Sequence, residues 1–178
     1  MKVSIGFSTS DWWVSRAIRY VTRAEVSHTF FLLQENGPVG DLVLEAEWCG
    51  WKLSTPNALT RGTTRVVKYV VPAVDLTSAV SDSLLWLDEK YNYPGLLGML
   101  WVCLGRILGK RWRNPLRNHN SMFCSEAAVY VLQGAGYPGA AALDPQSVDP
   151  QALLDFLTAG ELALQQRRNI PWDGAHVK

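Results

Sequence analysis

The pattern of apolar residues changes close to residue 73, and this change limits the folds open to the chain more than any other feature. Before it, β-branched and aromatic runs predict strands in KVSIGFS (2–8), VSHTFFLLQ (26–34), LVLEAEWCGWKLS (42–54) and TRVVKYVVP (64–72). After it, apolar residues at three- and four-residue spacing predict helices in DLTSAVSDSLLWLDEKY (75–91), LGMLWVCLGRIL (97–108), FCSEAAVYVLQGAG (123–136) and SVDPQALLDFL (147–157). The sequence therefore predicts an α+β fold in which a small antiparallel sheet packs against helices.

Two further helix signals refine this layout. The segment TSDWWVSRAIRYVTRA (9–24) has apolar residues at helical spacing, and we expect Ser10 or Asp11 to cap that helix. Near the other end, Asp149 is expected to cap the last helix, with Pro150 in its first turn. A chain of 178 residues without repeats or a linker predicts one domain over residues 1–178, with 168–178 as a loosely held tail.

Charge and cysteine content exclude several classes of protein. The net charge is +1, so the chain lacks the overall basic character of a nucleic-acid-binding protein, and no specific nucleic-acid partner is expected. Cys49, Cys103 and Cys124 form no CxxC pair, which argues against a disulfide framework and predicts a reducing compartment such as the cytoplasm. The first residues are broken by Ser, Thr and Asp and do not resemble a signal peptide, and no apolar run is long enough to predict a membrane span.

Cys124 is the first candidate for chemistry, because it stands where a helix is predicted to begin. Its spacing to Ala128 and Val131 puts Cys124 on the helix face turned toward the body of the protein and predicts that Glu126 points away from it. The unpaired N–H groups and the dipole of a helix N-terminus lower the pKa of a thiol and favour the nucleophilic thiolate. The competing interpretation is a small buried hydrophobic residue, the usual role of a free cysteine.

A nucleophilic cysteine needs a base, and the chain has only three histidines. His28 lies in a predicted strand, His119 in a basic loop and His176 in the tail. Glu45 interrupts the neighbouring predicted strand, where a carboxylate could orient the His28 ring as the third member of a triad. Glu47 is on the same face of that strand and is the alternative third member.

These segments, read in order, resemble the circularly permuted, papain-like NlpC-type hydrolases, in particular the YiiX-like branch. SHTFFLL, LVLEAEWCGWKLS, KYNYPGLLG, FCSEAAVYVLQGAG and SVDPQALLDFL carry the resemblance, which covers roughly residues 4 to 157. It implies a permuted papain-like fold in which the histidine strand precedes the cysteine helix. It also implies Cys124 as nucleophile, His28 as base and Glu45 as the orienting residue, with acyl transfer through a thioester and with no metal or cofactor.

Three functions follow as alternatives from these observations. The first is a cysteine hydrolase that cleaves an amide in a peptide or cell-wall fragment, and the second is a lipid esterase or acyltransferase on the same fold. The third is a non-catalytic binding module in which the three residues only support the structure. A zinc site of Cys103, His119 and Cys124 is disfavoured, because these spacings form no ligand pair.

The substrate and the oligomeric state are left open by the sequence. A run of cations that includes Lys110, Arg111, Arg113 and Arg117 precedes Cys124 and has Trp112 within it. We expect this loop either to be a solvated face or to edge the cleft and favour an anionic substrate, such as a cell-wall peptide carboxylate or a lipid headgroup. The apolar segment before it either fills the core or offers an acyl chain or a membrane surface a peripheral contact.

Overall fold

A computed structural model describes residues 1–35, 40–47, 49–87, 90–116 and 121–168. Its main sheet has five antiparallel strands in the order β4-β3-β2-β1-β5. Their bounds are β1 Lys2–Thr9, β2 His28–Gln34, β3 Leu42–Glu47, β4 Gly50–Ser54 and β5 Arg65–Val70. A second, two-stranded parallel sheet joins β6 (Lys90–Tyr91) to β7 (Ser121–Met122).

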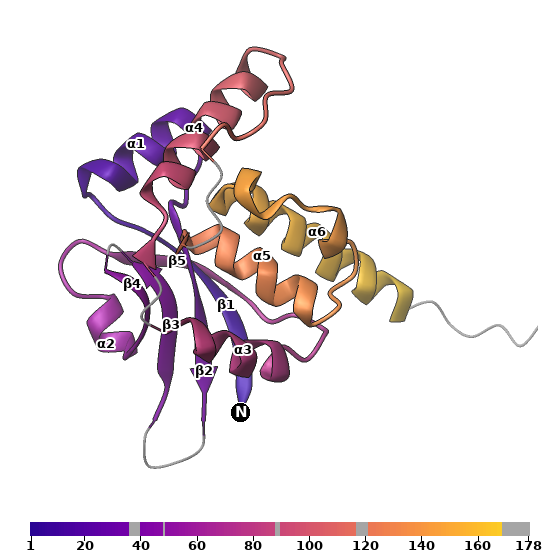
Figure 1. Cartoon of the computed structure of the whole chain (residues 1–178). Coiled ribbons are helices and arrows are strands. Elements are labelled where there is room, and N and C mark those ends of the chain that lie inside the picture. The colour runs from indigo at the N-terminus through magenta and orange to yellow at the C-terminus, as the bar shows by residue number, and fades with distance from the viewer. Residues whose placement is uncertain (36–39, 48, 88–89, 117–120, 169–178) are drawn as a thin grey trace, which may run out of the picture.

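The helices are distributed unevenly around the main sheet (Figure 1). The α-helices are α1 Trp13–Thr22, α2 Pro56–Leu59, α3 Thr77–Ser83, α4 Tyr93–Ile107, α5 Cys124–Gly134 and α6 Pro150–Arg168, and the short 3₁₀ helices are η1 Leu84–Trp86, η2 Ala140–Ala142 and η3 Pro145–Ser147. Helices α3, α5 and α6 cover one face and enclose the largest core with it. The opposite face carries α2 and a smaller cluster of Phe30, Val43 and Leu59. This arrangement confirms the predicted α+β class.

The side chains of β2 alternate between the two faces of the sheet, as the sequence predicts. Phe31 and Leu33 of β2 enter the large core, whereas Phe30 enters the cluster on the opposite face. Successive side chains of a strand point to opposite faces, so a strand buried on both faces carries a continuous apolar run, as FFLL does. His28 begins this strand and shares the face of Phe30.

Helices α1 and α4 pack against each other at one end of the sheet, away from the main helical layer (Figure 1). Their contact is a separate core in which Ile18 of α1 meets Leu96, Met99 and Cys103 of α4, together with Phe123. Phe123 immediately precedes α5. The two cores therefore adjoin at the residue next to Cys124.

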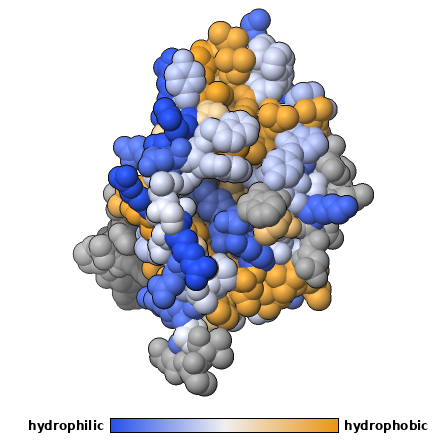
Figure 2. Space-filling model, turned by 90° about the vertical axis from the view of Figure 1, so that its left-hand side faces the viewer, coloured by the Kyte–Doolittle hydropathy of each residue, from blue (hydrophilic) through white to orange (hydrophobic). Residues whose placement is uncertain are grey.

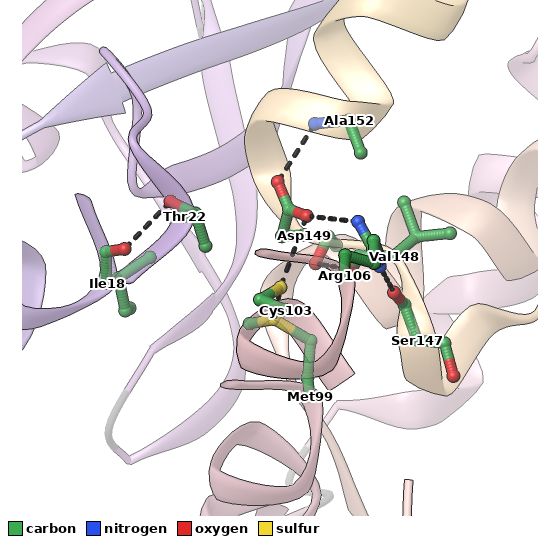
Figure 3. A network of polar contacts seen from close by, with 10 residues as sticks. Ile18, Thr22, Met99, Cys103, Arg106, Ser147, Val148, Asp149 and Ala152 are labelled. Carbon is green, nitrogen blue, oxygen red and sulfur yellow. Dashed lines mark hydrogen bonds and ion pairs between the residues drawn. The ribbon is translucent and has the colours of Figure 1, made fainter. Parts of the chain in front are cut away.

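A polar cluster around Asp149 ties α4 to the start of α6 (Figure 3). One carboxylate oxygen of Asp149 accepts a hydrogen bond from the backbone N–H of Ala152. The other accepts hydrogen bonds from Nη1 of Arg106 at 3.0 Å and from Sγ of Cys103 at 3.5 Å. Arg106 also donates to the carbonyl of Ser147. Asp149 thus caps α6, as predicted, and also anchors α4.

Four local predictions need correction. LVLEAEWCGWKLS forms two antiparallel strands, β3 and β4, instead of one. The residue before α1 is Trp12, which provides no side-chain cap, so neither Ser10 nor Asp11 has the predicted role. The helix predicted over 75–91 stops as α3 at Ser83 and continues only as the 3₁₀ turn η1. Glu126, expected to point away from the body of the protein, is 1% exposed. Of the predicted tail 168–178, residues 169–178 lie outside the described part.

Candidate active site

Helix α5 begins at Cys124, as the sequence predicted, with extended backbone at Phe123 before it. Glu126 in the first turn accepts the backbone N–H of Phe123 at 3.3 Å and the Asn92 side-chain amide at 3.3 Å. Asn92 in turn caps α4, because its Oδ1 accepts the N–H of Gly95 at 2.7 Å. The starts of α4 and α5 are therefore fixed to each other through buried polar side chains.

His28 and Glu45 form a hydrogen-bonded ion pair. Nε2 of His28 lies 2.9 Å from Oε2 of Glu45, whose side chain is 1% exposed. Phe30 pairs directly with Glu45 across β2 and β3, so His28 is a diagonal neighbour of Glu45 on the same face. Ser54 of β4 donates to the other carboxylate oxygen of Glu45 at 3.1 Å. The register of three strands thus fixes the imidazole from behind.

The same ring interacts with Cys124, because each of the two groups shifts the pKa of the other through charge and hydrogen bonding. Since Nε2 is engaged by Glu45, Nδ1 is the nitrogen available to the sulfur. Burial disfavours charge on the ring, but the charge and hydrogen bonds of Cys124 and Glu45 outweigh that cost and raise the pKa of His28 to about 10. The structure therefore brings together Cys124, His28 and Glu45, the three residues that the sequence singled out.

The pKa of Cys124 is shifted downward, in the direction opposite to the shift of His28. Burial alone would raise the pKa of the Cys124 thiol, yet the charged ring of His28, with N–H groups of Thr29 and Ser125, lowers it. The same pairing lowers the pKa of Glu45 despite burial, because its carboxylate faces His28 and Lys52. These directions favour a thiolate–imidazolium pair in the resting protein.

Tyr91 is a fourth member that sequence reasoning did not assign. Burial, followed by the charge and hydrogen bonding of the nearby Cys124, raises the pKa of Tyr91 well above its ordinary value. The parallel pairing of Tyr91 with Met122 across β6 and β7 places it beside the start of α5. The sequence signal was KYNYPGLLG, but nothing in that segment alone identifies which tyrosine faces the thiol.

Glu47, the alternative to Glu45, lines the same groove but pairs with Lys52 instead of His28. Its Oε2 is 2.6 Å from Nζ of Lys52, and its side chain is 37% exposed. The same lysine reaches Glu45 only at 3.7 Å. The residue that contacts the ring is therefore Glu45.

A groove of about 710 Å³ opens onto this site. His28, Glu45 and Tyr91 lie along it, whereas Cys124, only 4% exposed, is reached through its contacts with His28 and Tyr91. Helices α1 and α4 supply an apolar wall, and the strand ends and loops opposite supply hydroxyl side chains and charges, including Arg61. The apolar wall consists of Trp12, Trp13, Val14, Ala17, Ile18, Tyr93, Leu96, Leu97 and Leu100.

Two hydroxyls on this groove, those of Ser8 and Thr9, have no hydrogen-bond partner among the described residues, and Ser8 is the more buried of the two. Ser8 is 1% exposed, pairs with His28 across β1 and β2, and lines the groove. Within the described residues its Oγ makes no hydrogen bond, unlike that of Ser27 nearby, which bonds Ser15 at 2.5 Å. Buried polar groups are normally satisfied, so this hydroxyl is suited to contact a ligand.

Other predicted features lie away from the groove. Cys103 donates to Asp149, and burial with that carboxylate raises its pKa to about 12. Among the described residues no three His, Cys, Asp or Glu side chains are placed to hold a metal ion. Lys110, Arg111 and Arg113 do not line the groove, so the expectation that they edge the cleft is wrong for these three. His119, Arg117 and His176 lie outside the described residues.

Comparison with known proteins identifies no relative: no protein-family model matches the sequence, and a search of the curated proteins finds no similar one. No helix within the described residues is long and apolar enough to cross a bilayer. The fold and the site therefore define this chain only as an α+β protein with a buried Cys–His–carboxylate arrangement.

Proposed function

We propose that this protein is a cysteine hydrolase that transfers an acyl group through a thioester on Cys124. The observation that carries the proposal is the ring of His28, which is hydrogen-bonded to Glu45 and interacts with Cys124 strongly enough to lower the pKa of the thiol. A structural role for the three residues would not require their pKa values to move toward a thiolate–imidazolium pair. The order of the histidine strand and the cysteine helix agrees with a permuted papain-like fold, which is part of this proposal.

The chemistry proceeds in two steps in which bonds and protons balance. The Cys124 thiolate attacks the carbonyl carbon, and the N–H groups at the start of α5 stabilise the oxyanion. The bond from this carbon to the leaving nitrogen or oxygen then breaks, and His28 gives its proton to that atom. Water next loses a proton to His28 and attacks the thioester, which releases the acid and restores the thiolate. Glu45 and Tyr91 hold the ring and the sulfur throughout.

An amide of a peptide or cell-wall fragment remains the substrate that the sequence predicts. The apolar wall of the groove is a specific observation in favour of the second candidate, an ester or amide of a fatty acyl group. Either substrate would pass through an acyl group on the same sulfur.

Mass spectrometry of the acid-quenched protein tests the proposal. After incubation with nitrophenyl esters of short and medium chain length, and with peptide anilides, we expect the mass of one acyl group on the peptide that contains Cys124. The adduct should be absent in Cys124→Ser and should form more slowly in His28→Ala, because the thiol then loses the charge that lowers its pKa. Substrate turnover that survives Cys124→Ser would contradict the proposal. The proposal would also fail if Cys124 forms no acyl adduct and iodoacetamide leaves its thiol unlabelled, as expected of a binding module.

A further inference from the structure

Helix α4 is apolar on the side that faces solvent as well as on the side that faces the protein. Leu96, Met99, Val102 and Cys103 are buried against the rest of the molecule. On the opposite side a second apolar set recurs every three or four residues, and each member is between 41% and 61% exposed. We call this set the α4 stripe: Tyr93, Leu97, Trp101, Leu104 and Leu108.

The α4 stripe is continuous with the groove of the candidate site. Tyr93 and Leu97, its first members, also line the groove. At the start of the neighbouring α1, Trp12 and Trp13 line the same groove and are 57% and 71% exposed. Figure 2 shows orange apolar groups and pale aromatic rings together at the upper end of the molecule, the end where α1 and α4 lie in Figure 1. Exposed apolar surface of this extent marks a contact with a partner or a lipid surface.

The charge around the α4 stripe distinguishes between a protein partner and a lipid surface. Residues 12–24 and 93–116 contain no acidic residue, whereas seven basic residues fall within them: Arg16, Arg19, Arg23, Arg106, Lys110, Arg111 and Arg113. The whole chain has a net charge of only +1, so the remainder is net negative. Arg106 is paired with Asp149, but Lys110, Arg111 and Arg113 are exposed just beyond the stripe.

Trp101 and Trp112 add an aromatic pair between stripe and cations. Their rings stack at 4.3 Å, and Lys110 Nζ lies 5.8 Å from the Trp112 ring. Apolar side chains bordered by tryptophan and by Lys or Arg are the composition of elements that lie in the interface of an anionic bilayer. A second copy of the chain would bring the same positive charges together and is disfavoured for that reason.

We propose that the α1–α4 pair docks on an anionic lipid bilayer through the α4 stripe, and that the groove then receives an acyl chain of a bilayer lipid. The docking stands on the surface alone, whereas the second part rests on the proposed hydrolase function. The Asp149 cluster that anchors α4 to α6 (Figure 3) would hold the stripe rigidly while it is in contact with the lipid.

Vesicle co-sedimentation of the full chain tests the docking. We expect binding to vesicles of phosphatidylcholine with phosphatidylglycerol, and much weaker binding to phosphatidylcholine alone. Leu104→Ser with Leu108→Ser, which do not line the groove, should reduce the partition coefficient about tenfold or more because apolar area is lost. The control pair Leu85→Ser and Leu162→Ser, which are 87% and 55% exposed elsewhere, should bind as the wild type does.

A second pair of double variants tests how much the basic residues contribute to vesicle binding. Lys110→Glu with Arg111→Glu should reduce binding to the anionic vesicles at least about tenfold, with a weaker dependence on salt, because each basic residue contributes near the surface. Lys2→Glu with Lys68→Glu changes the net charge equally at exposed sites away from α4 and should have a small effect.

The outcomes separate this inference from the proposed function. The docking would be overturned if the wild-type protein binds neither vesicle, or if the stripe variants bind as the wild type does. It would also be overturned if the protein forms a dimer that the stripe variants lose and does not bind vesicles. Each of these results would hold even if Cys124 forms an acyl adduct. Vesicle binding with an unreactive Cys124 would overturn the hydrolase function and leave the docking in place. Docking together with an acyl adduct of lipid origin on Cys124 supports both, and docking with acylation only by peptide donors refutes the lipid substrate.

Discussion

At the scale of single residues, the site depends on the ring of His28, which is partly buried and interacts with both Glu45 and Cys124. Because the charged His28 lowers the pKa of Cys124, the rate of alkylation by iodoacetamide should rise with pH through an inflection below the ordinary thiol value of 9.0. In His28→Ala the charge of the ring is lost and only the N–H groups of Thr29 and Ser125 still oppose burial, so the inflection should move to higher pH and the rate at neutral pH should fall about 10- to 100-fold.

Cys103 provides an internal comparison for this measurement, because its pKa is raised to about 12. It should stay unlabelled at neutral pH in the folded protein, as peptide mapping would show. Equal labelling of Cys103 and Cys124 would contradict the resting ion pair.

Glu45 and Glu47 offer a matched test of the third member. Glu45→Gln removes the charge behind the ring, so we expect kcat/KM for an acyl donor to fall on the order of 100-fold, with the pH optimum displaced as the pKa of His28 drops. Glu47→Gln removes only a half-exposed pair with Lys52 and should change kcat/KM by less than about twofold. Equal losses in the two variants would refute the assignment of Glu45.

Ser8 and Ser27 line the same groove and differ in whether the hydroxyl is satisfied. Ser8→Ala removes an unpaired buried hydroxyl, so thermal unfolding should show unchanged or slightly higher stability, whereas KM should rise about fivefold if the hydroxyl contacts substrate. Ser27→Ala breaks its bond to Ser15 and should cost about 1 kcal/mol. A Ser8→Ala variant that loses stability and keeps its KM would indicate a purely structural role.

At the scale of elements, the approach of the 110–116 segment to α4 depends on a glycine. A Cβ at Gly98 would lie 1.7 Å from Oδ1 of Asn114, whose amide donates to the carbonyls of Gly95 and Gln146. Gly98→Ala must therefore displace a buried asparagine, and we expect chemical denaturation to show a loss of about 2–3 kcal/mol.

Gly134 at the end of α5 is the control for this substitution. A Cβ there would meet its nearest atom, Cβ of Ala79, at 3.6 Å, an ordinary contact. Gly134→Ala should be neutral or stabilise the fold by up to about 1 kcal/mol, because alanine is the better helix former. If Gly98→Ala is equally harmless, the described packing of Asn114 is wrong.

The elements also show where sequence reasoning succeeds. The start of α5 and the face of β2 follow from local periodicity, and Glu45 is conspicuous because a carboxylate interrupts an apolar strand. The β3–β4 hairpin was missed because only two residues separate the end of β3 at Glu47 from the start of β4 at Gly50. The contact of Tyr91 with Cys124 depends on the pairing of β6 with β7, which are only two residues long and far apart in the chain.

At the scale of the whole molecule, the candidate site lies where two cores adjoin. Cys124 belongs to the core under the main sheet, and Phe123 belongs to the core between α1 and α4. The sheet and α5 hold the reacting groups, whereas the helix pair provides the apolar wall of the groove. Local patterns could not predict this wall, because the exposed and the buried apolar side chains of α4 read as one continuous run.

The most direct test of the central claim is a pH titration of the His28 ring, monitored by NMR through its Cε1–H signal. The signal is assigned by its loss in His28→Ala. Because Cys124 and Glu45 raise the pKa to about 10, the ring should stay protonated well above pH 8 in the wild type, and its pKa should fall in Cys124→Ser. A ring that titrates near the ordinary histidine pKa of 6.5 and does not respond to Cys124→Ser would show that sulfur and imidazole do not form the pair on which this account rests.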